Sequence, residues 1–131
     1  MKLLLDTHIW LWSLLDPNRL SDKVAKELEQ PTNELWLSPI SLWESILLHE
    51  KGKLRLEPDA FAWIKSALQR VPLKEAPINN EVALQSRKVE LAHQDPADRF
   101  IAATAQIYEL TLVTADERLF NSDTYSLLAN R

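Results

Sequence analysis

The stretch Lys2-Leu3-Leu4-Leu5-Asp6 opens the chain with three consecutive leucines and ends on a charged residue. A short apolar run that stops at a polar residue is typical of a buried strand in a parallel sheet. Residues 7–15 follow directly and are apolar on nearly every side, so a helix here has to be covered on two faces. We therefore expect a strand and a largely buried helix to begin an α/β fold.

The rest of the chain repeats this alternation of short apolar runs and helical segments. Further strands are predicted at residues 34–37, 73–76, 111–114 and 125–128. Further helices are predicted at residues 21–30, 38–50, 58–71, 79–91 and 98–109. Strands that alternate with helices indicate βαβ units on a parallel sheet, and 131 residues suit one domain over residues 1–131.

Scarce residue types exclude several kinds of site. The chain has one glycine, Gly52, whereas phosphate-binding loops, dinucleotide fingerprints and nucleophile elbows each need two or more. The absence of cysteine excludes disulfides, thiolate catalysis and cysteine-based metal sites. The charge at Asp6 comes too early for a signal peptide, and no stretch approaches a membrane span. We expect a cytoplasmic protein without membrane contact, whose net charge of -4 argues against a broad grip on nucleic acid.

Four carboxylates occupy related places along the chain. Asp6 and Asp116 follow predicted strands, Asp98 opens a predicted helix, and Glu44 lies within the apolar helix at 38–50. Ligands of open α/β sheets bind beyond the carboxyl ends of the strands, so at least three of these acids should converge. Taken singly, Asp98 and Asp116 could instead cap helix N-termini.

This acid cluster needs a counter-ion. Arg99 and Arg118 are the bases near these acids in sequence, and they do not obviously neutralise four carboxylates. An oxygen-rich site without cysteine or closely spaced histidine pairs suits Mg²⁺ or Mn²⁺. Carboxylate clusters of this kind usually serve phosphoryl chemistry. His8 is expected to be a packed or surface residue, and His49 and His93 have no partner at ligand spacing.

Four sequence motifs, in order, resemble those of a known family. They are Leu3-Leu4-Leu5-Asp6-Thr7-His8, Ser41-Leu42-Trp43-Glu44, Asp95-Pro96-Ala97-Asp98-Arg99-Phe100-Ile101-Ala102-Ala103-Thr104-Ala105 and Leu112-Val113-Thr114-Ala115-Asp116. Together they resemble the PIN-domain ribonucleases, and most closely the VapC-type toxins of bacterial type II toxin–antitoxin pairs. The resemblance implies a three-layer α/β/α domain with a short, mainly parallel central sheet of four to five strands.

The resemblance also implies a site and an activity. By it, the four acids coordinate Mg²⁺ or Mn²⁺ and position a water that attacks a phosphodiester of single-stranded RNA. Thr7 and Thr114 fall where family members place a supporting hydroxyl beside the metal. Asp95 could join the site through water, or serve as a turn residue before Pro96. One departure is Leu48, which stands where many relatives carry a lysine that would clamp a phosphate.

Rival functions and partner surfaces remain open at this point. A PIN-fold RNA-processing nuclease outside a toxin–antitoxin pair, or a non-catalytic α/β interaction domain, would fit the same pattern. The five tryptophans could stack on bases, although packing is the better interpretation for at least four of them. The apolar helix at 7–15 leaves no polar side for water, which predicts that a second copy of the chain or an antitoxin segment covers one arc.

Overall fold

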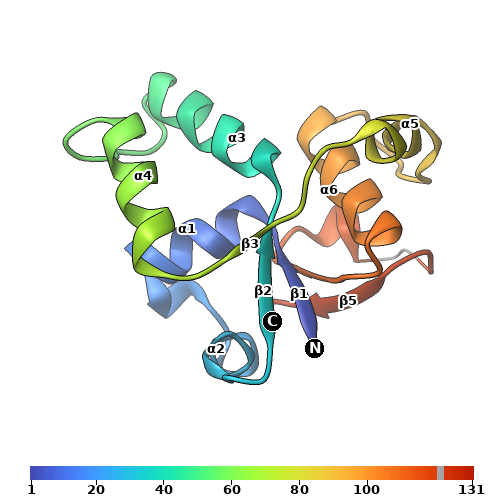
Figure 1. Ribbon diagram of the computed structural model, residues 1–131, viewed down its shortest axis with the longest axis horizontal. Coiled ribbons are helices and arrows are strands. Elements are labelled where there is room, and N and C mark those ends of the chain that lie inside the picture. The colour runs from blue at the N-terminus through green and yellow to red at the C-terminus, as the bar shows by residue number, and fades with distance from the viewer. Residues whose placement is uncertain (121–122) are drawn as a thin grey trace.

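A parallel sheet organises the molecule. The computed structural model describes residues 1–120 and 123–131, and within this part of the chain five strands form one sheet in the order β3-β2-β1-β4-β5 (Figure 1). Every neighbouring pair is parallel, with Leu3 opposite both Leu35 and Thr111. The strands are β1 (Lys2–Leu5), β2 (Glu34–Leu37), β3 (Lys74–Glu75), β4 (Thr111–Thr114) and β5 (Ser126–Ala129).

The helices lie close to the predicted ranges. The α-helices are α1 (Thr7–Leu15), α2 (Asp22–Glu29), α3 (Pro39–Glu50), α4 (Ala60–Arg70), α5 (Asn80–Lys88) and α6 (Pro96–Ile107). Two short 3₁₀ turns, η1 (Pro17–Arg19) and η2 (Glu117–Leu119), follow α1 and β4. Ser21, Ser38 and Asn79 cap three of these helices, because each accepts a hydrogen bond from a backbone N–H in the first turn of its helix.

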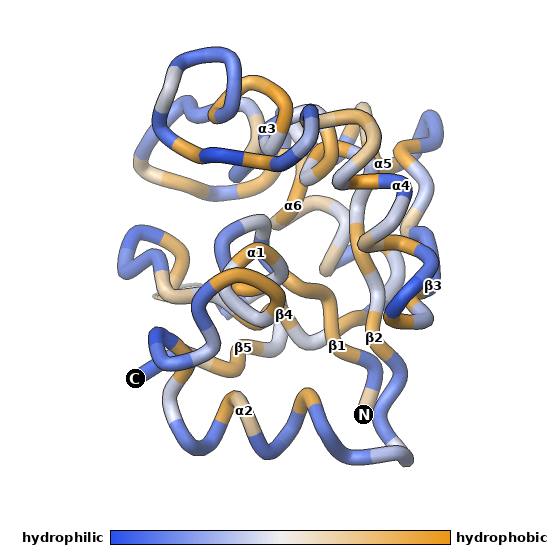
Figure 2. Tube along the Cα trace, turned by 90° about the vertical axis from the view of Figure 1, so that its left-hand side faces the viewer, coloured by the Kyte–Doolittle hydropathy of each residue, from blue (hydrophilic) through white to orange (hydrophobic). Residues whose placement is uncertain are grey.

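The leucines of β1 divide the core between two faces of the sheet. Leu3 and Leu5 pack with residues of α1, α2 and α4, whereas Leu4 packs with residues of α6. Accordingly, α1 and α4 lie to one side of β1 and β2, and α5 and α6 lie to the other (Figure 1). Figure 2 shows hydrophobic residues along β1, β4 and α1 in the interior. The arrangement is the predicted three-layer α/β/α fold.

In two helices, α1 and α4, some large apolar side chains are exposed instead of buried. In α1, Ile9, Trp10 and Leu11 are buried, while Trp12 is half-buried and Leu15 is 42% exposed. The part of the α1 surface that is left uncovered is therefore smaller than the sequence predicts. In α4, Ala60, Ile64 and Ala67 are buried and Trp63 packs against the core, whereas Phe61 is 63% exposed.

The order of the strands creates a crevice. The chain runs from β1 outward to β2 and β3, and later strands add on the other side of β1. The carboxyl ends of β1 and β4 are thus the switch point at which an open α/β sheet binds ligands. Among the described residues, no helix is long and apolar enough to cross a membrane.

Candidate active site

An open pocket of about 430 Å³ lies at the carboxyl ends of β1 and β4. All four acids predicted from the sequence line it, together with Asp95. Its remaining lining residues are His8, Trp12, Arg19, Ala115 and Arg118. Five carboxylates face two arginines here, which leaves a formal excess of three negative charges if every carboxyl is ionised.

Asp6 is held by bonds to both of its carboxylate oxygens. It is 6% exposed, and its Oδ1 accepts a hydrogen bond from the Thr7 backbone N–H at 2.8 Å. Its Oδ2 accepts from the Thr114 hydroxyl at 2.6 Å. Burial raises the pKa of Asp6, and the charge of Glu44 raises it further, while the two hydrogen bonds oppose the shift. The side chain is fixed in a place that disfavours its negative charge.

The two predicted threonines connect the elements that carry the acids. The Thr114 hydroxyl donates to Asp6 and accepts from the backbone N–H of Asp116 at 3.0 Å, so it links the ends of β1 and β4. The Thr7 hydroxyl donates to the Ser41 hydroxyl at 2.9 Å, which joins α1 to the helix that carries Glu44. The Thr114 hydroxyl therefore bonds to the acid residues themselves, whereas the Thr7 hydroxyl links two helices that pack together.

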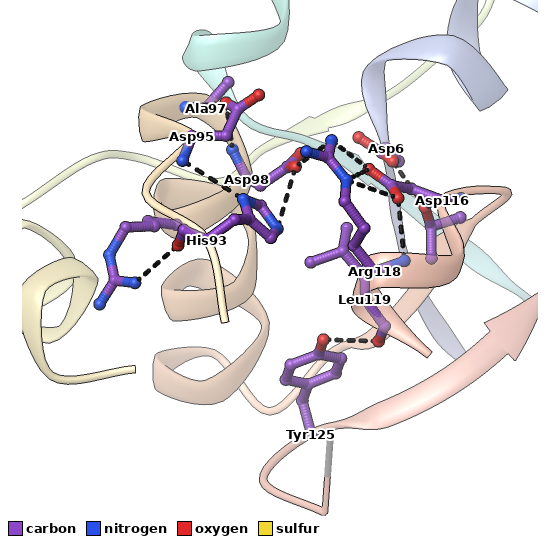
Figure 3. A network of polar contacts seen from close by, with 11 residues as sticks. Asp6, His93, Asp95, Ala97, Asp98, Asp116, Arg118, Leu119 and Tyr125 are labelled. Carbon is purple, nitrogen blue, oxygen red and sulfur yellow. Dashed lines mark hydrogen bonds and ion pairs between the residues drawn. The ribbon is translucent and has the colours of Figure 1, made fainter. Parts of the chain in front are cut away.

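Asp98 and Asp95 come from the start of α6 (Figure 3). Asp95 caps this helix, since its Oδ1 accepts from the backbone N–H groups of Ala97 and Asp98 at 3.0 and 3.4 Å. Asp95 thus caps α6 and at the same time lines the pocket. Asp98 is 6% exposed, and burial raises its pKa to about 8, with further contributions from the charges of Asp6, Asp95 and Asp116.

His93 lies beside Asp98, a contact that the sequence did not predict. Its Nδ1 accepts a hydrogen bond from the Asp95 backbone N–H at 3.3 Å. That bond places the ring proton on Nε2, which lies 3.6 Å from Asp98 Oδ2. The contact was hidden in the sequence because it depends on how the segment before α6 folds back over the helix N-terminus.

Arg118 bridges two of the acids (Figure 3). Its Nη2 lies 2.8 Å from Asp116 Oδ2 and 3.1 Å from Asp98 Oδ2, and its Nε lies 3.1 Å from Asp116 Oδ1. The hydrogen bonds from Arg118 lower the pKa of Asp116. Arg118 is therefore the counter-ion of Asp116, while the pocket as a whole keeps more carboxylates than bases, as expected. Arg99, the other nearby base, is buried and donates to backbone carbonyls instead.

Glu44 differs from the buried carboxylate that its apolar helix predicts. It is half-buried and reaches the pocket from α3, while the neighbouring Trp43 is 52% exposed. In the described part of the chain Glu44 makes no hydrogen bond or ion pair, which leaves its oxygens available as ligands. The negative charge of Glu44 acts on Asp6 across the pocket and raises the pKa of the Asp6 carboxyl.

Comparison with known proteins agrees with this geometry. Residues 3–123 match the model of the PIN domain. The chain belongs to the PIN domain family. Ribonuclease VapC22 of Mycobacterium tuberculosis (strain ATCC 25618 / H37Rv) is 32% identical over 117 residues, which cover 88% of each chain.

Solved structures show the same fold as this PIN domain at lower identity. VapBC2 from Rickettsia felis, bound to a promoter DNA fragment, has a TM-score of 0.71 and 18% identity, with 98% of each chain covered. DNA-bound VapBC from Salmonella typhimurium has a TM-score of 0.71 and 19% identity, with 100% of this chain and 99% of that chain covered.

The donor set of the PIN domain suits a hard divalent cation. The pocket offers carboxylate oxygens from four segments of the chain, and oxygen ligands are those that Mg²⁺ and Mn²⁺ prefer. Within residues 1–120 and 123–131, no three acids or histidines are close enough together to hold one ion. Arg118 is paired with both Asp98 and Asp116 in this arrangement. By its chemistry this donor set fits a divalent cation, and Arg118 occupies oxygens of Asp98 and Asp116 that such an ion would use.

Sequence reasoning missed several residues of the pocket. Arg118 is two residues from Asp116, and that spacing was a usable signal for an ion pair. Arg19 gave no such signal, because it reaches the pocket only through the turn that follows α1, and Trp12 lies among apolar residues of α1 that predict packing. His8, expected to be a packed or surface residue, is exposed and lies at the pocket rim.

Proposed function

We propose that this PIN domain is an endoribonuclease that requires Mg²⁺ or Mn²⁺, cleaves phosphodiester bonds of single-stranded RNA, and acts as the toxin of a toxin–antitoxin pair. The observation that carries the proposal is the meeting of Asp6, Glu44, Asp98 and Asp116, from four separate segments, in one pocket at the switch point of the sheet. The identity of 32% to a protein named as a ribonuclease supports the same conclusion.

In the proposed reaction, each acid has a role that follows from its surroundings. Asp6, Glu44, Asp98 and Asp116 would hold the cation, which supplies charge stabilisation and a more acidic water when bound. Thr114 and the Thr7 backbone fix the direction of the Asp6 carboxylate through their hydrogen bonds. Asp95 belongs to an outer position, since its Oδ1 is engaged in capping α6 and its charge acts on Asp98 from beside it.

The biological setting is the second part of the proposal. Residues 1–131 form one domain that works in the cytoplasm as a homodimer and is silenced by an antitoxin protein. Solved VapBC structures with this fold support an antitoxin partner. The excess negative charge of the pocket favours an antitoxin segment that carries an arginine, because a guanidinium pairs with carboxylates in two-point geometry and competes with metal.

Cleavage of a labelled RNA tests the nuclease activity. The purified protein should cut a single-stranded RNA in Mg²⁺ or Mn²⁺ and lose this activity in EDTA. Asp6→Asn and Asp98→Asn keep the side-chain shape but remove a charge, so both should fall to background with a native circular dichroism spectrum. Asp59→Asn is the matched control, because Asp59 caps α4 and lies outside the pocket lining. Wild-type rates in either pocket variant would contradict the proposal.

Co-expression tests the role as a toxin. Expression of the wild-type protein should arrest growth, and Asp98→Asn should not. A small protein encoded next to this gene should restore growth and bind the purified chain. Cleavage of RNA without growth arrest or such a partner would instead identify an RNA-processing nuclease. Absence of both metal binding and cleavage would identify an interaction domain.

A further inference from the structure

A shelf of three side chains lies at the mouth of the acidic pocket. We define it by His8 and Trp12 on α1 and Arg19 at the end of η1. The Arg19 guanidinium lies 4.3 Å from the centroid of the Trp12 ring, within the range of a cation–π contact. The His8 and Trp12 rings are 5.7 Å apart between centroids and tilted by 53°. His8 and Arg19 are exposed, so the shelf is open to solvent.

The backbone beneath Arg19 is held in place from the opposite end of the chain. Asn130, which follows β5, donates from Nδ2 to the Arg19 carbonyl at 3.0 Å. The Asn130 Oδ1 accepts from the Ser21 backbone N–H at 2.6 Å. Since both the backbone and the guanidinium are restrained, Arg19 loses less conformational entropy on binding a ligand than a mobile surface arginine does.

Arg19 is the arginine of the pocket whose charge is available to a ligand. Arg118 is already paired with Asp98 and Asp116. Arg19, by contrast, forms no ion pair with a carboxylate in the residues that the structure describes, and its guanidinium carbon lies over an aromatic ring. A guanidinium in this position still has N–H groups to offer, and two of them can match two oxygens of a phosphate.

A second cavity continues from the shelf away from the acids. It measures about 310 Å³ and shares His8, Trp12 and Arg19 with the acidic pocket. Its lining adds Leu48 and Lys53, from the end of α3 and the turn after it. The shelf is therefore the point where the two hollows meet, and a chain-like ligand that crosses the acidic pocket passes over it.

We propose that Arg19, held over the Trp12 ring, binds an RNA phosphate next to the one that is cleaved, and that the strand then continues over the second cavity toward Lys53. The inference rests on the proposed nuclease function and names how that site holds its substrate. An RNA strand matches the shelf because each nucleotide brings a phosphate for the guanidinium and a base that can stack on the exposed His8 ring. An acidic peptide would use the charge but leave this ring without a partner.

Binding measurements with a labelled single-stranded RNA test this inference. We would introduce Arg19→Ala into the Asp98→Asn background, which prevents cleavage, and measure fluorescence anisotropy at several salt concentrations. Affinity should fall roughly tenfold, and the slope of log K against log salt should become shallower by about 0.7 for one lost contact with a phosphate. Arg70→Ala is the matched control, because it removes the same charge from an exposed position outside both hollows.

Arg19→Lys separates charge from planar stacking. Lysine keeps the positive charge but loses the flat fork, so it should restore the salt slope while recovering the affinity in part. Equal RNA affinities of Arg19→Ala and Arg70→Ala would overturn the inference and leave the nuclease proposal intact if the wild-type protein still cleaves RNA. If Arg19→Ala instead weakens binding of the antitoxin and leaves RNA affinity unchanged, the shelf belongs to a protein interface and the inference is wrong. Loss of cleavage by the wild-type protein would refute the nuclease proposal separately.

Discussion

The Asp98 carboxyl makes the stability of the metal-free protein depend on pH in an unusual direction. Its pKa is about 8 in the folded chain, against an ordinary value of 3.8. Between these two values the folded state keeps a proton that the unfolded state has lost. The free energy of unfolding therefore falls as pH rises from about 4 to about 8, and it levels off above that range. Asp6 acts in the same direction, since its pKa is also raised.

Thermal melting in EDTA checks this expectation. The wild-type protein should melt at a higher temperature at pH 5.5 than at pH 8. Asp98→Asn removes the titrating group, so it should melt several degrees above wild type at pH 8 and show a flatter dependence on pH. A wild-type melting temperature that rises steadily from pH 5.5 to pH 8 would mean that Asp98 is stabilised as a carboxylate, contrary to its buried, acid-rich surroundings.

At the scale of elements, Arg99 joins α5 to α6. It is 5% exposed, and it donates to the carbonyls of Ser86 and Val89 at 2.8 Å and of His93 at 3.2 Å. These carbonyls lie at the end of α5 and in the segment after it, where backbone acceptors lack helical partners. One side chain of α6 thereby supplies hydrogen-bond donors to the free carbonyls at and just after the C-terminal end of α5.

Arg99→Met should destabilise the fold strongly. The substitution keeps much of the apolar stem but leaves buried carbonyls without donors, which costs about 1–3 kcal/mol for each unsatisfied group. We expect a loss of roughly 3 kcal/mol or more in the free energy of unfolding, measured by urea denaturation. The exposed Arg87→Met on α5 serves as the control and should change stability by less than about 0.5 kcal/mol. Similar values for the two variants would show that water satisfies these carbonyls.

Local signals in the sequence predicted the elements better than their contacts. The leucine run of β1 and the serine before α2 act within a few residues, so their consequences could be predicted. Asp6 and Asp116 were predictable as site residues because the carboxyl ends of adjacent parallel strands have to meet. The positions of His93 beside Asp98 and of Arg19 in the pocket lining depend on the paths of loops, which the periodicity of the sequence does not describe.

For the whole molecule, metal binding and folding should be linked through the acid pocket. An ion that binds the folded chain raises the free energy of unfolding by about 2.7 kcal/mol at a hundred times its dissociation constant. Titration with Mn²⁺ should therefore raise the melting temperature, and less so at pH 5.5, where protons compete for the carboxylates. A shift that is equal at pH 5.5 and pH 8 would contradict a site built from several carboxylates.

Arg118→Ala sharpens this experiment. The variant removes a positive charge about 3 Å from Asp98 and Asp116, so Mn²⁺ should bind at least about fivefold more tightly and raise the melting temperature further. Arg87→Ala, which leaves the pocket unchanged, should behave as wild type. A smaller melting shift in Arg118→Ala than in Arg87→Ala would mean that the arginine assists the metal site instead of competing with it.

The parallel arrangement of the strands also determines where the two termini lie, and therefore where a fused protein would be located. All strands run in the same direction, and their carboxyl ends lie on the side of the sheet that carries the acids. Met1 precedes β1 and therefore lies on the opposite side, where its amine donates to the Asn33 side chain at 2.7 Å. Arg131 lies two residues after the end of β5 and one residue beyond Asn130, which donates a hydrogen bond to the Arg19 carbonyl. A purification tag or fluorescent fusion before Met1 should leave the pocket accessible. The same fusion after Arg131 would emerge beside the shelf and crowd the path of a substrate.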